Sequence, residues 1–163
     1  MYVSAIVLAA GKGSRFGSKI SKPLARIKSR EAIVYSFRAL QKHARIRDII
    51  VAVNAENRNA IEALIRRYKI SKVRAVVYGG KERRDSVAHA LEALHPQATI
   101  VLIHDSARPF IDRSVISAVI AATEKTGAAV VGVPVKATVK KIKSSCVVRR
   151  ASCVKTKNLI VEQ

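Results

Sequence analysis

Apolar residues along the chain fall into two kinds of segment that alternate. Five short runs are rich in valine and isoleucine and have the length of buried strands; they cover residues 3–8, 49–53, 73–78, 99–103 and 128–135. Four longer segments carry apolar residues at the three- and four-residue spacing of amphipathic helices; they cover residues 31–42, 57–69, 85–94 and 113–125. This order predicts an α/β protein with a mainly parallel central sheet and helices on both faces, a three-layer sandwich.

The region 136–159 departs from this alternation. Two β-prone runs, 138–142 and 146–148, flank Lys143-Ser144-Ser145 and predict a β-arm, a hairpin that projects from the sheet. Such an arm cannot bury an apolar face by itself, so we expect it to pack on a second subunit in a homodimer. The length of 163 residues and the 49% hydrophobic content predict one domain over residues 1–163.

The most informative motif follows the first predicted strand. In Leu8-Ala9-Ala10-Gly11-Lys12-Gly13-Ser14-Arg15, the glycines lie beyond the carboxyl end of a strand, where open α/β sheets bind ligands. Glycine there lets backbone N–H groups approach a polyphosphate, and Arg15 and Lys22 add positive charge. The spacing matches neither the Walker motif nor the dinucleotide fingerprint, whose third glycine would fall on Phe16. A simple strand-to-helix turn is the alternative interpretation.

A second glycine motif follows the third predicted strand. Gly79-Gly80 permits close approach of a ligand, and Asp85 or Ser86 can cap the next helix, whose N-terminus attracts anions. An ordinary capped loop with solvated arginines would explain Asp85 but not the glycine pair.

The fourth predicted strand ends in His104-Asp105-Ser106-Ala107-Arg108. Asp105 is placed to hold a magnesium ion or a ribose hydroxyl, and Arg108 can bind a phosphate with its fork of donors. His104 is expected to be structural, because attack by an ionised phosphate needs no general base. The remaining histidines, His43, His89 and His95, have no spacing typical of metal ligands, and we assign them no role.

Charge and cysteine content narrow the class of protein. Lysine and arginine number 31 against 11 acidic residues, a net charge of 31 − 11 = +20, which attracts nucleic acid, an anionic membrane or a small polyanion. The basic residues are spread along the sequence and aromatic residues make up only 4%, so we expect most of the basic residues to form a solvated surface; a nucleic-acid partner is the less favoured alternative, which charge alone leaves open. Cys146 and Cys153 are expected to be reduced thiols of a cytoplasmic protein, with pairing across a hairpin as the alternative.

Four motifs occur together in one order, and this order resembles that of the 2-C-methyl-D-erythritol 4-phosphate cytidylyltransferases. The motifs are Ala9-Ala10-Gly11-x-Gly13-x-Arg15 with Lys22, Gly79-Gly80-x-Glu82-Arg83-x-Asp85-Ser86-Val87, His104-Asp105-x-Ala107-Arg108-Pro109 and Pro134-Val135-x-x-Thr138-x-Lys140. The resemblance implies a Rossmann-like fold. It also implies transfer of CMP from CTP to methylerythritol phosphate with release of pyrophosphate, in the non-mevalonate isoprenoid pathway.

The same resemblance implies roles for individual residues. Arg15 and Lys22 would be catalytic and stabilise charge at the α-phosphorus of CTP, while Mg²⁺ bridges the CTP phosphates. The nucleotide would be held by residues from the first three motifs, namely Leu8, Ala9, Ala10, Gly11, Gly13, Gly80, Arg83, Ser86 and Ala107. The acceptor would lie against Asp105, Arg108 and Thr138.

Three departures from the family pattern concern the acceptor site and the C-terminus. Ala137 stands where the family usually has an aspartate, Thr156 aligns with an arginine, and the chain ends at Gln163, before a C-terminal segment of the family. These departures predict a C-terminally short, divergent member. They leave two alternatives: a cytidylyltransferase for another polyol phosphate such as ribitol phosphate, or a non-catalytic remnant that binds nucleotide or nucleic acid.

Overall fold

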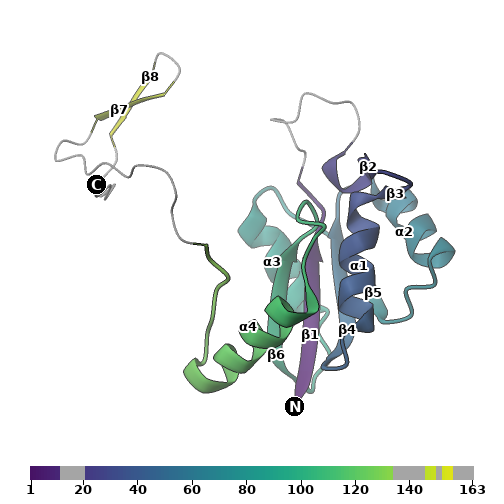
Figure 1. Ribbon diagram of the computed structural model, residues 1–163. Helices are drawn as coiled ribbons and strands as arrows, with labels where there is room; N and C mark the ends of the chain where they lie inside the picture. The colour runs from purple at the N-terminus through teal and green to yellow at the C-terminus, as the bar shows by residue number, and fades with distance from the viewer. Residues whose placement is uncertain (12–20, 134–145, 150–151, 156–163) are drawn as a thin grey trace. The chain divides into compact units, whose positions relative to one another are not determined.

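The computed structural model describes residues 1–11, 21–133, 146–149 and 152–155 (Figure 1). The chain forms two compact units, Met1–Ala129 and Val130–Gln163. The strands of the first unit are β1 Tyr2–Leu8, β2 Arg26–Ile27, β3 Arg30–Glu31, β4 Ile46–Val53, β5 Val73–Tyr78 and β6 Ala98–Asp105. Its helices are the 3₁₀ turn η2 Lys22–Leu24 and the α-helices α1 Ala32–Lys42, α2 Arg58–Arg67, α3 Arg83–Glu92 and α4 Arg113–Thr126.

Four parallel strands form the central sheet, in the order β5-β4-β1-β6. The two middle strands, β1 and β4, are apolar along most of their length because both of their faces are covered. In β6, at the sheet edge, burial alternates over Ile100–His104. The predicted α/β class and mainly parallel sheet are therefore confirmed.

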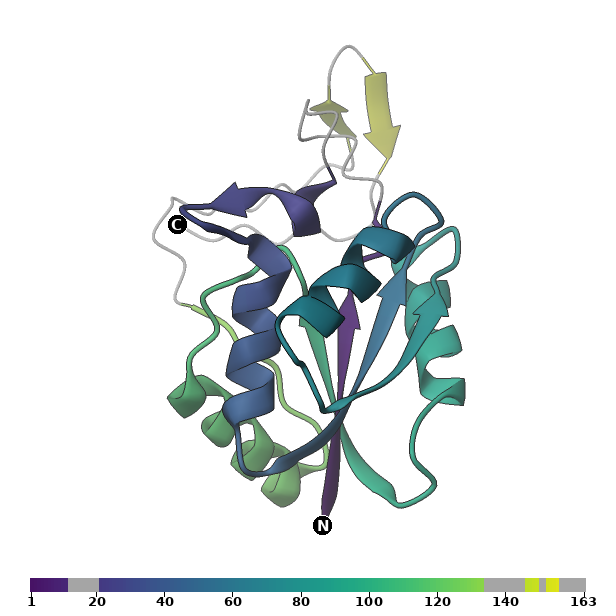
Figure 2. The ribbon, with the colours of Figure 1, turned by 90° about the vertical axis from the view of Figure 1, so that its right-hand side faces the viewer.

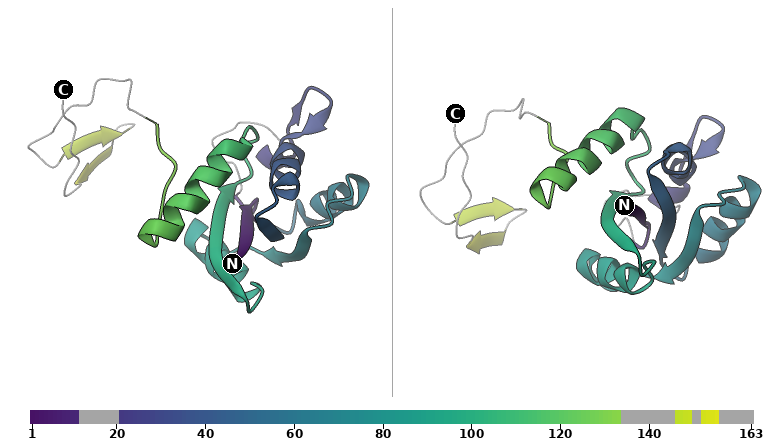
Figure 3. Two further views of the ribbon diagram at one scale, coloured as in Figure 1. Left: turned by 60° about the horizontal axis from the view of Figure 1, so that its bottom comes forward. Right: turned by 90° about the horizontal axis from the view of Figure 1, so that it is seen from below.

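Helices cover both faces of this sheet, but unequally. Three helices, α1, α2 and α4, pack on one face around Phe37, which is fully buried. Of the described helices, α3 alone packs on the other face, where Ala90 meets Ile6 and Ile50. Figure 2 shows α1 and α2 in front of the strands, and the view from below in Figure 3 shows α3 alone on the opposite side.

The predicted elements match the observed ones closely up to residue 126. Four strands and four α-helices lie where the apolar pattern placed them, with most ends shifted by one to three residues. The last of these helices, α4, begins after Asp112, whose side chain accepts a hydrogen bond from the Ser114 N–H, and it ends at Gly127 with φ of 81°. In the ranges that the structure describes, no helix has the length and apolar character needed to cross a membrane.

The fifth predicted strand, 128–135, is wrong over the residues that the structure describes. Residues 128–133 belong to no strand, and Val130 and Val133 are 93% and 86% exposed. The valine content of this run suited a strand, but β-propensity reflects packing against neighbouring strands and does not form a strand without them. Residues 134 and 135 lie outside the described residues.

The second unit contains an antiparallel hairpin of β7 Cys146–Arg149 and β8 Ser152–Lys155. The predicted strand 146–148 is confirmed, but its described partner is β8, which the sequence analysis did not predict, and 138–142 lies outside the described residues. In this register Cys146 is opposite Lys155 and Cys153 is opposite Val148. The two cysteines are therefore not cross-strand neighbours.

Candidate active site

The carboxyl ends of the four parallel strands meet at one edge of the sheet, which we call the rim. It is built from the segments that follow β1, β4, β5 and β6, namely residues 8–11, 54–57, 78–82 and 105–108. In open α/β sheets this edge is where ligands bind. The described residues of the glycine and aspartate motifs fall on it.

The segment after β1 is held by hydrogen bonds at Leu8 and Ala9, and it is open at Gly11. The Ala9 N–H donates to the Ala52 carbonyl at 2.7 Å, and the Ser106 hydroxyl donates to the Leu8 carbonyl at 2.7 Å. No hydrogen bond to a described residue uses the N–H of Ala10 or Gly11. A Cβ placed on Gly11 would meet no described atom within 4 Å. Backbone donors for a phosphate therefore begin at Ala10, and Ala9 has a positioning role.

Two asparagines after β4, which the sequence analysis did not single out, hold this segment. The Asn57 side chain is 1% exposed and donates from Nδ2 to the Ala9 carbonyl at 2.8 Å and to the Ser21 Oγ at 3.4 Å. Asn54 donates from Nδ2 to the Ala10 carbonyl at 3.3 Å. Asn57 thus contacts the chain on both sides of residues 12–20.

The two asparagines also fix each other. The Asn54 N–H donates to Asn57 Oδ1 at 3.1 Å, and the Asn57 N–H donates to Asn54 Oδ1 at 2.9 Å. Asparagine forms such turns because its short side chain reaches nearby backbone groups. The signal that could have identified them is a pair of asparagines three residues apart, directly after an apolar strand.

We expect Asn57→Ala to destabilise the protein and to loosen the rim. The substitution leaves a buried Ala9 carbonyl without its donor, a loss worth about 1–3 kcal/mol in the free energy of unfolding. Asn59→Ala is the matched control, because Asn59 is exposed on α2. Urea unfolding of both variants measures the effect, and an equal loss from the two would contradict the positioning role.

The segment after β5 approaches the first segment closely. A Cβ on Gly79 would lie 2.3 Å from the Ala10 Cβ and 2.6 Å from the Ser86 Oγ. The Gly80 N–H donates to the Ser86 hydroxyl at 3.1 Å, and that hydroxyl donates to the Glu82 carbonyl at 3.2 Å. Glycine is therefore required at position 79 by the packing of two rim segments against each other.

The first turn of α3 lies at the rim, because the helix begins directly after the segment that follows β5. The helix begins at Arg83, with Glu82 at the N-cap, and the Asp85 carboxylate accepts a hydrogen bond from the Glu82 N–H at 2.9 Å. The sequence predicts that Asp85 or Ser86 caps this helix. Asp85 does so from within the first turn, in a capping box with Glu82, whereas Ser86 is buried and holds Gly80.

Three charged side chains join α3 to the end of β6. The Arg83 guanidinium donates to Asp105 Oδ1 from Nη2 at 3.1 Å and from Nε at 3.3 Å. Arg108 Nε lies 3.5 Å from Asp105 Oδ2. The arginine side chains are more than 60% exposed, so these pairs add little to stability, but they leave two positive charges against one negative charge. This cluster suits a ligand that carries phosphate.

The structure brings most of the predicted site residues together. Leu8, Ala9, Ala10, Gly11, Gly80, Arg83, Ser86, Asp105, Ala107 and Arg108 all lie on the rim or at the start of α3. Lys22 begins η2, next to Ser21, which Asn57 contacts. Gly13, Arg15, Thr138, Ala137 and Thr156 lie outside the described residues.

His104 lies in the core between β6 and α1. It is buried, and its Nε2 is 3.0 Å from the hydroxyl of Ser36 in α1. Burial lowers the pKa of His104, because the charged imidazolium loses its hydration. This geometry agrees with the predicted structural role.

Stability should therefore fall in acid partly through His104. Its pKa is lowered in the folded state, so its stabilising contribution is complete above the unfolded pKa of about 6.5 and is lost as the pH falls below that value. We expect the difference in unfolding free energy between the wild type and His104→Gln to shrink from pH 7.5 to pH 5. Urea unfolding at each pH measures it, and a difference independent of pH would contradict the assignment.

Comparison with known proteins places the chain in a family. The family model described as IspD, 2-C-methyl-D-erythritol 4-phosphate cytidylyltransferase, matches residues 3–155. A protein of that name from Alkaliphilus metalliredigens is 40% identical over 141 residues, which are 86% of this chain and 58% of the relative. One from Bacillus thuringiensis is 41% identical over 143 residues, which are 88% of this chain and 63% of the relative.

The chain belongs to the 2-C-methyl-D-erythritol 4-phosphate cytidylyltransferase family. It spans about 58–63% of the length of these two relatives. A solved structure, the 4-diphosphocytidyl-2C-methyl-D-erythritol synthase of Anaerococcus prevotii, has a TM-score of 0.64 and 22% sequence identity, and the match covers 96% of this chain and 64% of that one. This likeness supports the Rossmann-like fold expected for the family.

Proposed function

We propose that this chain is a CTP-dependent transferase that moves CMP from CTP to 2-C-methyl-D-erythritol 4-phosphate and releases pyrophosphate. The main support is the meeting, on one rim, of the open backbone at Ala10 and Gly11 with the glycine segment at 79–80 and the start of α3. This combination of backbone donors and positive charge suits a nucleoside triphosphate. Membership of the family names the nucleotide and the acceptor.

In this proposal the nucleotide lies between the rim segment that follows β1 and the rim segment that follows β5. The triphosphate takes hydrogen bonds from the N–H groups of Ala10, Gly11 and the residues that follow. The cytidine lies against Gly80, Ser86 and Ala107. Arg83 turns from Asp105 to a phosphate oxygen when the triphosphate binds, because a phosphate offers it a charge-assisted bond of at least equal strength.

The proposed reaction is an in-line displacement at phosphorus. An oxygen of the acceptor phosphate forms a bond to the α-phosphorus of CTP, and the bond from that phosphorus to the bridging oxygen breaks, so that pyrophosphate leaves. The attacking oxygen is already ionised, which is why no general base is required. Arg15 and Lys22 stabilise the charge that develops at the α-phosphorus, and the rim holds the two anions in line.

The acceptor is proposed to lie at the β6 side of the rim. Arg108 has a 79% exposed side chain and can place its donors on the phosphate of the acceptor. Asp105 can then accept hydrogen bonds from the sugar hydroxyls, with Thr138 as the third group. In this assignment Arg83 contacts a phosphate of CTP, Asp105 the hydroxyls of the acceptor and Arg108 the phosphate of the acceptor.

Magnesium fits this site mainly through the triphosphate itself. The described residues contain no group of three or more histidine, cysteine, aspartate or glutamate side chains placed to hold a metal. At the rim, the Asp105 carboxylate has two guanidinium neighbours, which oppose the binding of a cation. Mg²⁺ commonly keeps several waters and binds through substrate phosphates, and when bound it neutralises their charge.

We further propose that the protein forms a homodimer and is located in the cytoplasm.

The release of pyrophosphate tests the proposal. The chain is incubated with CTP, Mg²⁺ and methylerythritol phosphate, and in parallel with ribitol 5-phosphate or with UTP in place of CTP. We expect release that requires both CTP and methylerythritol phosphate. Release only with ribitol phosphate would overturn the acceptor assignment, and no release with either acceptor would overturn the transferase assignment.

A further inference from the structure

A second concentration of positive charge lies at the edge of the sheet opposite the rim. Helices that link parallel strands run back along the sheet, so α1 and α2 end near the amino ends of the strands. Figure 3 (right) looks toward this edge. We call it the basic edge and define it by Arg38 and Lys42 of α1, Arg47 of β4, Arg67 of α2, and Lys69 and Lys72 of the α2–β5 connection.

Contacts between the ends of α1 and α2 hold these groups together. Two guanidinium groups lie over the Tyr68 ring, with the Arg38 Cζ at 5.4 Å and the Arg67 Cζ at 5.6 Å from its centre. Gln41 of α1 donates from Nε2 to the Lys69 carbonyl at 3.1 Å. The same Gln41 accepts at Oε1 from the Lys72 N–H at 3.4 Å. The basic groups therefore belong to one joined surface although they come from separate elements.

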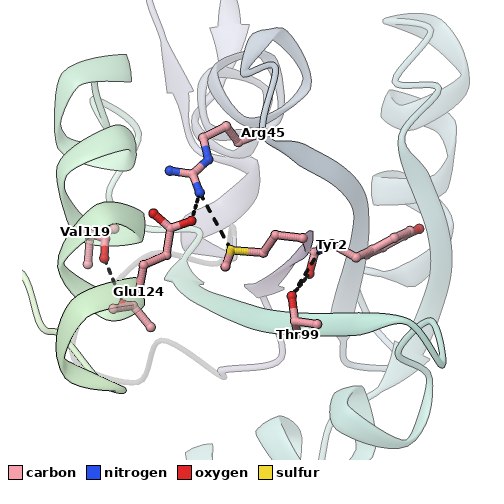
Figure 4. Close-up of polar contacts among 7 residues, drawn as sticks. Tyr2, Arg45, Thr99, Val119 and Glu124 are labelled. Carbon is pink, nitrogen blue, oxygen red and sulfur yellow. Dashed lines mark hydrogen bonds and ion pairs between the residues drawn. The ribbon is translucent and has the colours of Figure 1, made fainter.

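Little negative charge balances this edge. Among the described residues, none of the six basic-edge side chains takes part in an ion pair. Nearby, Arg45 pairs with Glu124 and also contacts the sulfur of Met1, as Figure 4 shows. Asp48 is buried and accepts from the Tyr2 hydroxyl at 3.1 Å. Lys42, Arg47, Arg67 and Lys69 are exposed, so their charge faces solvent. Lys72 is half-buried and donates from Nζ to the His43 carbonyl at 2.8 Å.

The pKa values of the buried His43 and the half-buried Lys72 reflect the same positive charge. The pKa of Lys72 is lowered by burial and then by the nearby Arg47. The pKa of His43 is lowered by burial and then by Arg113, Lys72 and Arg45. Positive groups at this edge are thus close enough to oppose one another.

Stabilisation of the helix ends does not by itself explain why basic residues gather at this edge. Lys42 and Arg67 lie in the last turns of their helices, where a positive charge is favourable by a small amount. Lys69, however, has φ of 51°, a left-handed conformation that suits glycine or asparagine better than lysine. The position after α2 therefore carries a charge where backbone conformation alone would favour another residue.

We propose that the basic edge binds the phosphodiester backbone of a nucleic acid. Arginine and lysine groups on one surface are the usual contacts to such a backbone, and they need no base-specific partner. The six residues that define the basic edge are all charged, and the exposed Met1 contacts the nearby Arg45, so this surface offers little to insert into a lipid bilayer. The sequence analysis expected a solvated basic surface because the charges are spread along the chain, but the fold gathers them.

This inference is independent of the proposed transferase activity, because the basic edge and the rim lie at opposite ends of the strands. CTP bound at the rim should leave nucleic-acid binding unchanged. Conversely, variants at the basic edge should leave pyrophosphate release unchanged. Failure of one proposal is therefore distinguishable from failure of the other.

The chain offers a closely matched pair of variants for the test. Lys42→Gln with Lys69→Asn removes two charges from the basic edge. Lys28→Asn with Arg30→Gln removes two charges from the β2–β3 hairpin, at the opposite end of α1 from Lys42, and Lys28 has φ of 55°, like Lys69. Asparagine tolerates the left-handed conformation, so both double variants should fold.

The measurement is the fluorescence anisotropy of labelled oligouridylate RNA and labelled duplex DNA, each about 20 units long, titrated with the full chain at several salt concentrations. We expect salt-dependent binding of at least one of these probes, unaffected by CTP with Mg²⁺. The basic-edge double variant should bind on the order of tenfold more weakly at 0.1 M salt, with a salt slope smaller by about two. The control double variant should bind like the wild type.

Three outcomes would overturn the inference. They are equal weakening in both double variants, displacement of the probe by CTP with Mg²⁺, and binding to phosphatidylglycerol vesicles without binding to either nucleic acid. The comparison of RNA with DNA then identifies which nucleic acid supplies the backbone.

Discussion

Lys22→Ala is expected to lower the turnover of nucleotidyl transfer by about a hundredfold or more. Lys22 begins η2, directly after Ser21, which Asn57 links to the segment that follows β1. A charge donor held in place before the reaction stabilises the transition state more than the bound substrate, so its loss lowers kcat on the order of a hundredfold. Steady-state pyrophosphate release measures the change. Arg15→Ala should have an effect of the same size.

Two further variants make this prediction specific. Lys125→Ala removes a lysine from the exposed surface of α4 and should leave kcat unchanged. Lys22→Arg keeps the positive charge and should retain more activity than Lys22→Ala. Near-normal turnover in Lys22→Ala, with the protein folded, would remove Lys22 from the catalytic machinery.

Gly79→Ala is expected to separate the two glycine segments of the rim. The new Cβ would lie 2.3 Å from the Ala10 Cβ and 2.6 Å from the Ser86 Oγ, and the first of these atoms can move only with the backbone. Overpacking of this kind costs about 1–3 kcal/mol of stability. Because both segments are proposed to hold CTP, its affinity should also fall by at least roughly tenfold. Thermal unfolding and calorimetric titration with CTP and Mg²⁺ measure the two effects.

Two other glycines separate the effect on folding from the effect on binding. Gly11→Ala should leave the stability of the free protein unchanged, because its Cβ would meet no described atom within 4 Å. It should still weaken CTP binding, since the methyl group would occupy space that a phosphate needs. Gly132→Ala also meets no described atom, and position 132 is not part of a rim segment, so the substitution should change neither property. CTP affinity in Gly11→Ala equal to that of the wild type would contradict the backbone cradle.

The sequence predicted the elements well where one face or both faces of an element are buried. The apolar runs of β1 and β4 and the helical spacing of α1 follow directly from burial against the sheet, so their positions could be read from the pattern alone. The run 128–133 has similar valine content but forms no strand. A composition typical of strands therefore predicts a strand only where the fold provides a neighbour.

The candidate site was predictable in its motifs but less so in its contacts. The glycines and charged residues of the rim follow strands, and this position was enough to bring them together. Asn54 and Asn57 were missed because their role depends on reaching the Ala9 and Ala10 carbonyls, 44 to 48 residues away in the chain. The pairing of Arg83 with Asp105 was missed for the same reason, since the two residues come from different elements.

The most direct measurement of the central claim is a crystal structure of the chain with CTP and Mg²⁺. The account predicts the triphosphate against the N–H groups that begin at Ala10 and Gly11, with the cytosine ring beside Gly80 and Ser86. A rim without nucleotide at saturating CTP, or CTP bound at another surface of the protein, would contradict it.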